Sequence, residues 1–455
     1  MLKITDDEFI ETIGTRAERA QELKPCPVGS EGACCRTCYV GPCRFMGKNA
    51  EEEVRGVCAS TLGIVTSRQF LTMCASGSAI HAARARESVD KLLEVSEKEQ
   101  NIRDKQKLNA VADLLEISSA KKSKGKLAKQ VADTYLRWFY EYSPMVFGQL
   151  PSKRLSIWKK HQLLPKGIDR EIAESTYNAS VGVNYDVEDI LKQAARVSIA
   201  DGWLSSTIVA DVEDITERTR VPYNQKAKIA DNYWCKMLGN ENGASLKTLG
   251  NLITSGDIRG IACLIDCDHP RYEESSAQRF IALELIKNDI LVITGGCNRT
   301  LEDAGLLNIN NAMKVTGRKL KKVYENDGIP PVISVGGCIS HSRVLTVLSA
   351  LAKENMVGGI DDISELPCVI LAPHWYSGTA ISIGCFYTVA GVETIFGGKS
   401  LVHASKEATS ILENTWKEQF GAAFRFIETA TDIVEKVVDY VDGVRKNAGL
   451  VSYYP

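Results

Sequence analysis

The sequence predicts a helical N-terminal part followed by one doubly wound α/β domain with a parallel, Rossmann-like sheet. Three observations predict this fold class. Apolar residues recur at steps of three and four up to about residue 240, as they do in amphipathic helices. From about residue 245, short β-rich runs alternate with helical patterns. These runs are apolar almost throughout, which is typical of parallel strands that are buried on both faces of a sheet.

The N-terminal part is expected to begin with a cysteine-rich segment, residues 1–60, and to continue as a helical domain over residues 61–244. The expected helices are Glu87–Ser96, Gln106–Glu116, Gly125–Tyr142, Val187–Ala210 and Lys226–Leu238. In each of them the apolar residues follow the helical period.

The α/β domain is expected over residues 245–455. Its predicted strands are Gly260–Ile265, Asp289–Thr294, Val332–Val335, Cys368–Leu371, Thr394–Phe396 and Phe424–Ile427. Helical patterns lie at Ser276–Lys287, His341–Asn355, Thr379–Ala390 and Ala430–Asn447. This alternation of strands and helices predicts a parallel sheet that is covered by helices on both faces.

Composition and charge exclude several classes of function. The chain has 455 residues, of which 44% are hydrophobic and 25% charged, and this argues against disorder. Lys and Arg number 55 against 57 Asp and Glu, so we expect no nucleic-acid partner. No apolar run approaches the ~20 residues of a membrane span, and the charged start lacks the apolar core of a signal peptide. We therefore expect a cytoplasmic protein.

Cysteine is the unusual residue of this chain. There are fourteen cysteines, and in a cytoplasmic protein they are expected to be thiols or metal ligands, because disulfides rarely persist there. Six of them cluster near the N-terminus: Cys26, Cys34, Cys35, Cys38, Cys43 and Cys58. Such clustering predicts metal binding.

Four of the six, Cys35, Cys38, Cys43 and Cys58, match the four thiolates that a cubane iron–sulfur cluster needs. A zinc site made of four cysteines is the alternative. Cys34 is adjacent to Cys35, and neighbouring residues cannot easily ligate one tetrahedral centre. Cys26 and Cys34 then form a half-site, which a second copy of the chain would complete across a two-fold axis. The alternative is that these two are buried thiols without a ligand. The half-site predicts a homodimer with one shared cluster.

Three further cysteines, Cys267, Cys297 and Cys338, each follow one of three consecutive predicted strands. Ligands of open α/β sheets bind beyond the carboxyl ends of the strands. Two of the cysteines follow a Gly-Gly pair, which allows close backbone approach. We therefore predict a metal centre there, with core packing as the alternative.

The other cysteines and histidines have a weaker case. Secondary ligand candidates are Cys263, Cys235, Cys385 and His269, and His374 is a ligand or acid–base candidate because it follows a strand. Core packing is the default for Cys263, Cys235 and Cys385. Four histidines, His81, His161, His341 and His403, are assigned to surface or core positions.

The segment from Cys26 to Cys58, with its Cys-Cys-Arg-Thr-Cys and Gly-Pro-Cys-Arg motifs, resembles the N-terminus of anaerobic nickel–iron carbon monoxide dehydrogenases. Later motifs with the same resemblance are Ala200-Asp-Gly-Trp203, Thr294-Gly-Gly-Cys297 and Gly337-Cys338. The related hybrid cluster proteins share the architecture. The resemblance implies that one [4Fe-4S] cluster within each subunit is held by Cys35, Cys38, Cys43 and Cys58. It also implies that Cys26 and Cys34 hold half of a second cluster, which is shared between subunits. In the catalytic cluster, the resemblance implies that Cys267 and Cys297 ligate cubane irons and that Cys338 ligates nickel.

The chain departs from this family pattern in several ways. It is shorter and lacks one α/β domain, which normally supplies a histidine and two cysteines of the catalytic cluster. A lysine of the family lies in a stretch that here reads Ser377-Gly-Thr-Ala380. Of the helix histidines that pass protons in the family, only His81 is kept, and the segment Gly384–Gly398 has no histidine.

These observations lead to three hypotheses. The first is an oxygen-sensitive iron–sulfur oxidoreductase that transfers electrons to or from a small molecule at a remodelled cluster, with two [4Fe-4S] relays and a small redox carrier such as ferredoxin. The second is a minimal CO dehydrogenase, which converts CO and water to CO2, two electrons and two protons. The third is a non-catalytic electron-transfer or cluster-carrying protein. The sequence leaves the presence of nickel open.

Overall fold

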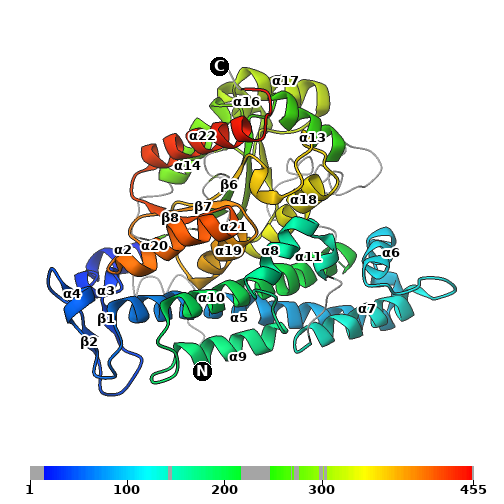
Figure 1. Ribbon diagram of the computed structural model, residues 1–455. Coiled ribbons are helices and arrows are strands. Elements are labelled where there is room, and N and C mark those ends of the chain that lie inside the picture. The colour runs from blue at the N-terminus through cyan, green and yellow to red at the C-terminus, as the bar shows by residue number, and fades with distance from the viewer. Residues whose placement is uncertain are drawn as a thin grey trace.

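The computed structural model describes residues 15–141, 146–216, 246–267, 269–270, 276–296, 301 and 305–452 (Figure 1). The expected helix Lys226–Leu238 lies outside these residues. Over residues 15–60, the cysteine-rich segment forms three short helices and a hairpin: α2 (Arg16–Glu22), α3 (Pro27–Ser30), β1 (Cys34–Cys35), β2 (Cys43–Arg44) and α4 (Ala50–Glu53).

The helical part is organised around one long helix, α5 (Leu62–Glu97), which runs beneath the sheet in Figure 1. The expected helix Glu87–Ser96 is only its last part. The sequence pattern does not predict the first part of α5, because its buried side chains include small and polar ones, such as Ser67 and Ser78. These side chains do not form an apolar stripe along the helix. Around it lie α6 (Lys105–Leu114), α7 (Lys124–Trp138), α8 (Ser152–Lys160), α9 (Ile168–Ala179) and α10 (Val187–Ala200).

The expected helix Val187–Ala210 is interrupted. After α10, a π-helical turn, η3 (Asp201–Ser205), precedes α11 (Ser206–Thr216). π-Turns insert one extra residue into a helix and often occur at functional sites. The apolar period of the sequence does not reveal this insertion, because all five residues of the turn are buried.

The α/β part contains one parallel sheet, and its predicted strands are confirmed to within two residues. The strands are β3 (Gly260–Asp266), β4 (Ile290–Gly296), β5 (Val332–Ser334), β6 (Cys368–Ala372), β7 (Glu393–Gly397) and β8 (Phe424–Ile427). Their order is β5-β4-β3-β6-β7-β8. The strand order therefore reverses between β3 and β6, the point at which doubly wound sheets bind ligands.

Helices cover both faces of the sheet, as predicted. α14 (Ser276–Lys287) and α22 (Ala430–Asn447) pack on one face, with Leu264, Val292 and Val369 in the core between them. On the other face, α18 (Ser342–Lys353) and α19 (Gly378–Val389) connect the sheet to α5 and α10 in one continuous core. Further elements among the described residues are α13 (Leu246–Ser255), α16 (Ile309–Val315), α17 (Arg318–Asp327), α20 (Lys406–Ser410), α21 (Trp416–Phe420), η1 (Glu99–Asn101), η2 (Val146–Gln149), η4 (Cys338–His341), η5 (Ile363–Glu365) and η6 (Ile411–Thr415).

No helix in the described part of the chain is both long enough and apolar enough to cross a membrane.

Helices α5 and α19 approach each other at two glycines, Gly77 and Gly378. A Cβ atom on Gly77 would lie 2.2 Å from the carbonyl oxygen of Gly378. Replacing Gly77 by alanine should therefore push the helices apart and lower the free energy of unfolding by about 1–3 kcal/mol. Gly443→Ala in α22 is the control, because nothing lies within 4 Å of a Cβ there. That variant should gain roughly 0.5–1 kcal/mol in a helix interior. Denaturant unfolding of both variants checks the difference, and equal effects would contradict the close approach.

Candidate metal centres at the hairpin and the strand ends

Of the four cysteines predicted to share one cluster, Cys35, Cys38 and Cys43 lie on the β1–β2 hairpin, which also carries Cys34. Cys35 and Cys43 are direct cross-strand partners. The turn between them is tight, because a Cβ atom on Gly41 would lie 3.1 Å from the carbonyl oxygen of Cys35 and 3.4 Å from that of Cys38. The hairpin therefore gathers Cys35, Cys38 and Cys43 within one small loop.

The fourth cysteine, Cys58, belongs to a loop that folds against this hairpin. The amide of Gly56 donates to the carbonyl of Ser60 at 2.9 Å, and a Cβ atom on Gly56 would lie 3.8 Å from Cys43 Sγ. The Ser60 hydroxyl, 3.1 Å from Cys58 Sγ, lowers the pKa of this thiol. A lowered pKa favours the thiolate, which is the form that binds metals.

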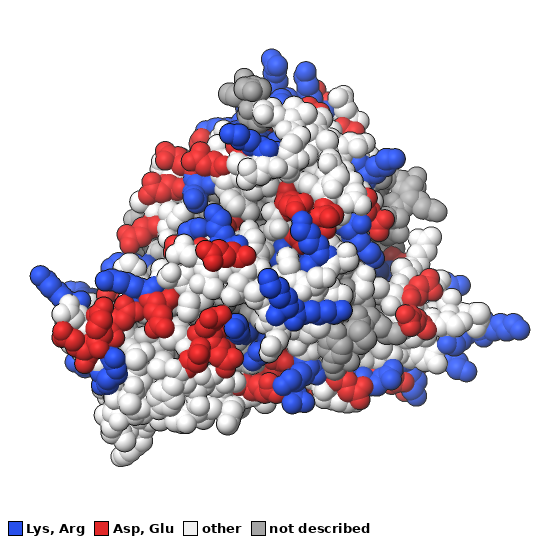
Figure 2. Space-filling model, viewed as in Figure 1, with Lys and Arg blue, Asp and Glu red and all other residues white. Residues whose placement is uncertain are grey.

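Cys26 and Cys34 lie nearer the surface. Cys26 is exposed at the start of α3, where the backbone N–H groups of Gly29 and Val28 lower the pKa of its thiol. Cys34 is partly exposed on β1. The same segment exposes five large apolar side chains: Leu23, Tyr39, Val40, Met46 and Val57. Figure 2 shows that the tip of the molecule at the lower left, where β1 and β2 lie in Figure 1, carries few charged side chains. This end of the chain combines exposed apolar groups with an exposed thiol.

Among the described residues, no group of three or more His, Cys, Asp and Glu side chains is arranged to bind a single metal ion. A cubane does not require such convergence, because each of its irons takes its own thiolate.

At the sheet, the strand register brings the cysteine-bearing loops to one level. Asp266, which precedes Cys267, pairs with Gly296 at the end of β4. The amide of Gly296 donates to the carbonyl of Gly336 at 2.9 Å, two residues before Cys338. Gly296 has to be glycine, because its φ is +151° and a Cβ atom would lie 2.2 Å from the Asp266 carbonyl oxygen. The predicted close backbone approach at this Gly-Gly pair is confirmed.

Two of the three strand-end cysteines, Cys267 and Cys338, belong to the residues that the structure describes. Cys267 and Cys338 are both partly buried, and the Gln278 amide donates to the carbonyl of Cys267 at 2.8 Å. Cys338 opens the 3₁₀ turn η4, which leads into α18. Cys297 lies outside the described residues, as does the weaker candidate Cys235.

A buried histidine, His81, lies beside Cys338, whereas the sequence pattern indicates only a surface or core position for it. His81 lies on α5 and is 2% exposed. Its Nδ1 is 2.9 Å from both carboxylate oxygens of Asp201, which is fully buried in the π-turn η3. The hydroxyls of Ser206 and Ser382 also donate to Asp201, at 3.1 and 2.5 Å. His81 is thus held in one orientation beside Cys338 and does more than fill the core.

This environment changes the charge of His81. Burial disfavours the imidazolium form, but the negative charge of Asp201, its hydrogen bond and the Cys338 side chain outweigh burial and raise the pKa of His81 to about 10. The imidazole therefore holds a proton at neutral pH. The only sequence signals of this pair were the histidine on the helix and the Asp201-Gly-Trp203 motif, which are 120 residues apart.

A second histidine, His341, ends the turn η4 and is fully buried, so that its assignment to the core is confirmed. Its Nε2 lies 3.0 Å from the carbonyl oxygen of Gly295. Burial, together with the charge of His81, lowers the pKa of His341 to about 4. The two histidines of this region therefore have opposite protonation states at neutral pH.

The weaker candidates lie in other surroundings. Cys263 is fully buried in β3, and contact with Cys368 contributes to raising the pKa of its thiol, after burial. Cys385 donates to the carbonyl of Ala194 at 3.6 Å within the helical core. The ring of His269 lies edge-on to that of Tyr376 at 6.0 Å. Cys263 and Cys385 thus have the core positions that were their default interpretation.

His374 is buried after the end of β6. Leu371 of β6 pairs with Leu264 of β3, so His374 and Cys267 follow their strands at the same level. His374 is therefore at the switch point of the sheet, beside the strand that leads to Cys267.

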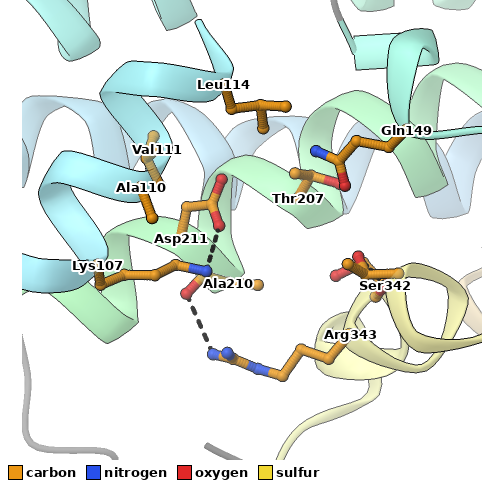
Figure 3. A pocket seen from close by; sticks show the side chains of 11 residues that line it. Lys107, Ala110, Val111, Leu114, Gln149, Thr207, Ala210, Asp211, Ser342 and Arg343 are labelled. Carbon is orange, nitrogen blue, oxygen red and sulfur yellow. Dashed lines mark hydrogen bonds and ion pairs between the residues drawn. The ribbon is translucent and has the colours of Figure 1, made fainter. Parts of the chain in front are cut away.

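A cavity of about 220 Å³ lies between α6, α11 and α18 (Figure 3). Its charged groups are paired: Lys107 Nζ is 2.9 Å from Asp211 Oδ1, and Arg343 donates to Asp214 at 2.5 Å. Ser342 of its lining donates to the carbonyl of Ser206, whose hydroxyl in turn donates to Asp201. Ser342 and Ser206 thus connect the lining of the cavity to Asp201.

Comparison with known proteins identifies relatives along the whole chain. A family model described as the Prismane/CO dehydrogenase family matches residues 33–232 and 217–431. The protein named carbon monoxide dehydrogenase 1 of Methanosarcina acetivorans is 26% identical and is aligned over 99% of this chain and 97% of its own length. The protein of the same name from Methanosarcina mazei is 27% identical with the same coverage. Both alignments extend over 617 positions, more than the 455 residues of this chain, so the relatives carry a stretch without a counterpart here.

Solved structures give the same result at the level of the fold. A nickel-free carbon monoxide dehydrogenase of Thermococcus sp. AM4 superimposes with a TM-score of 0.85 at 23% identity, over 98% of this chain and 96% of that one. Carbon monoxide dehydrogenase IV of Carboxydothermus hydrogenoformans superimposes with a TM-score of 0.84 at 20% identity, over 99% and 100%. With a family model that matches most of its length, the chain belongs to the Prismane/CO dehydrogenase family, as a shortened member.

Proposed function

We propose that this protein is an iron–sulfur oxidoreductase that exchanges electrons with a small molecule at a metal centre held by Cys267, Cys297 and Cys338. One observation carries the proposal: a protonated histidine, His81, is buried beside Cys338 and is oriented by Asp201. A closed structural cluster has no use for a buried proton donor. A small-molecule redox reaction needs one, because electron transfer to or from such substrates is coupled to proton transfer.

The donor set fits an iron–sulfur centre. Thiolates are the ligands of such clusters, and three protein thiolates leave one iron open to a substrate. When bound, the cluster supplies the electron store and the open coordination position. Within this chain, His81 delivers or accepts a proton at Nε2, Asp201 fixes the imidazole through Nδ1, and burial of both side chains excludes water.

CO oxidation is the second candidate function. It is favoured by the His81–Asp201 pair, which offers a proton-handling group at Cys338. Thr379 argues against CO oxidation, because this neutral residue stands at the position where the family resemblance implies a lysine. The reaction would take CO and water to CO2 and release two electrons and two protons.

Spectroscopy and turnover of the anaerobically purified protein test the proposal. We expect iron and sulfide beyond the content of the N-terminal clusters, and a change in the cluster spectrum on addition of CO, because an open iron binds small ligands. We also expect CO-dependent dye reduction below the 1–10³ per second typical of enzymes. A cluster spectrum that no small molecule changes would support the cluster-carrying hypothesis instead, and CO turnover within the typical range would establish the second candidate.

The N-terminal cysteines are proposed to form the electron relay. Cys35, Cys38, Cys43 and Cys58 would hold one [4Fe-4S] cluster per subunit, and a small redox carrier such as ferredoxin is the proposed partner. Cys26 and Cys34 would share a second cluster with another copy of the chain. The exposed side chains of Tyr39, Val40, Met46 and Val57 support such a contact, because an exposed apolar patch marks an interaction surface.

Replacing Cys26 and Cys34 together by serine should remove about two irons per chain, half of a shared [4Fe-4S] cluster, and should weaken the dimer. The cluster of the other four cysteines should remain, since its loop does not depend on the half-site. Iron analysis and size-exclusion chromatography under anaerobic conditions check this. The control is Cys74→Ser, a thiol buried in α5, which should leave the iron content unchanged. A stable monomer with the full iron content would contradict the shared cluster.

A further inference from the structure

The connection between α6 and α7 carries an unusual run of lysines, and the proposed function does not use it. Residues 117–132 contain no acidic, arginine or aromatic residue but five lysines: Lys121, Lys122, Lys124, Lys126 and Lys129. Residues 117–129 are called the lysine loop below. In Figure 1 the loop projects from the right-hand end of the molecule, and Figure 2 shows basic side chains at that end.

The fold anchors this loop at its base. The Gly125 amide donates to the Glu99 carboxylate at 3.1 Å. A Cβ atom on Gly125 would lie 2.2 Å from the carbonyl oxygen of Ser96, which belongs to the last turn of α5. Leu127 is buried in the helical core. The outward side of the loop carries three fully exposed lysines: Lys121, Lys126 and Lys129.

Folding stability does not explain these lysines. Ser123 caps α7, because its hydroxyl accepts from the Lys126 amide at 3.3 Å. The first turn of α7 holds Lys124 and Lys126 and no acidic residue, although the dipole of a helix disfavours cations at this end. The pKa of Glu99 is lowered by its hydrogen bonds to Ser123 and Gly125 first, and by Lys124 last. None of the five lysines forms an ion pair with a described residue, so their charge is available to a partner.

The composition of the loop distinguishes between anionic partners. The central residues of protein interfaces are typically tryptophan, tyrosine and arginine, whereas lysine is depleted there. Single-stranded nucleic acids are bound through aromatic side chains on which the bases stack. The lysine loop offers neither kind of anchor. Clustered lysines without such anchors are instead typical of segments that are attracted to anionic lipid headgroups, where charge alone provides the binding.

We propose that the lysine loop docks this protein on the surface of an anionic lipid membrane, without insertion. Each basic residue close to such a surface strengthens binding about fivefold, and salt screens the attraction beyond about 10 Å. The contact is therefore reversible and salt-dependent. Helix α5 has 36 residues and spans about 54 Å. The loop packs at its C-terminal end and the β1–β2 hairpin precedes its N-terminal end, so docking leaves the hairpin accessible. The inference does not depend on the metal centres.

Flotation of the anaerobically purified protein with lipid vesicles tests the inference. At low salt, the wild type should bind vesicles that contain phosphatidylglycerol and should not bind vesicles of phosphatidylcholine alone. Binding should weaken about tenfold or more in a variant with four substitutions in the loop: Lys121→Gln, Lys122→Gln, Lys126→Gln and Lys129→Gln. The melting temperature of this variant should equal or exceed that of the wild type, because the start of α7 loses unfavourable positive charge.

A control variant removes the same charge from four exposed lysines of the α/β part: Lys322→Gln, Lys417→Gln, Lys436→Gln and Lys446→Gln. It should bind anionic vesicles as the wild type does. Wild-type protein that does not bind these vesicles, or an equal loss of binding in both variants, would overturn the inference. Single-stranded RNA and polyglutamate are tested at the same salt and charge concentration. Tighter binding of either one than of the vesicles, lost in the loop variant, would replace the membrane by a nucleic acid or an acidic protein.

Discussion

Cys338→Ala should remove the strand-end metal centre and leave the N-terminal clusters intact. The loss expected for a cubane is on the order of four irons per chain, because a cluster left with two protein thiolates is poorly anchored. Cys267→Ala and Cys297→Ala should have the same effect, since the three cysteines follow neighbouring strands. The N-terminal clusters lie on the separate β1–β2 hairpin and should keep their spectroscopic signals. Iron analysis and EPR of the anaerobic variants provide the measurement.

Cys368→Ala is the matched control for this experiment. Cys368 is buried, at 1% exposure, and it lies at the opposite end of β6 from the strand-end loops. Its replacement should cost about 1 kcal/mol in packing and no iron. If Cys338→Ala behaves in the same way as Cys368→Ala, the strand-end cysteines are packing residues and the catalytic centre does not exist.

Asp201→Asn should lower the thermal stability of the protein most strongly at pH 6, and the loss should shrink as the pH approaches 10. The folded protein raises the pKa of His81 from its ordinary 6.5 to about 10. The stabilisation from this charge is therefore fully present below pH 6.5 and is lost as the pH rises through about 10. Asparagine carries no charge, so burial would then favour neutral His81. Breaking a buried ion pair costs on the order of 3–5 kcal/mol.

Melting temperatures of wild type and variant between pH 6 and pH 10 measure this effect. Ser382→Ala is the control, because it removes a hydrogen bond to Asp201 without removing the charge. Its cost, about 1 kcal/mol, should not depend on pH over this range. A stability difference for Asp201→Asn that stays constant with pH would show that Asp201 does not hold His81 in the charged state.

Much of the fold could be predicted from the sequence because its signals are local. Each buried strand of the sheet is a short apolar run, and all six were predicted to within two residues. Cys35, Cys38 and Cys43 were predicted to act together because they are close in the chain, and the hairpin does bring them together. The length of helix α5, in contrast, was underestimated because much of the helix lacks a local apolar signal. Its buried faces include glycine and serine, and these residues carry no apolar period.

The sequence by itself determined the order of helices and strands, the clustering of six cysteines and the placement of three more after neighbouring strands. These features depend on spacings within a few residues, which the chain encodes directly. Only the tertiary structure revealed the pair of His81 and Asp201, since a hydrogen bond across 120 residues depends on how α5 packs against η3. Likewise, the neutral state of His341 depends on burial against Gly295 and on the charge of His81. Charge states of buried groups are set by their neighbours in space, and a linear pattern does not contain those neighbours.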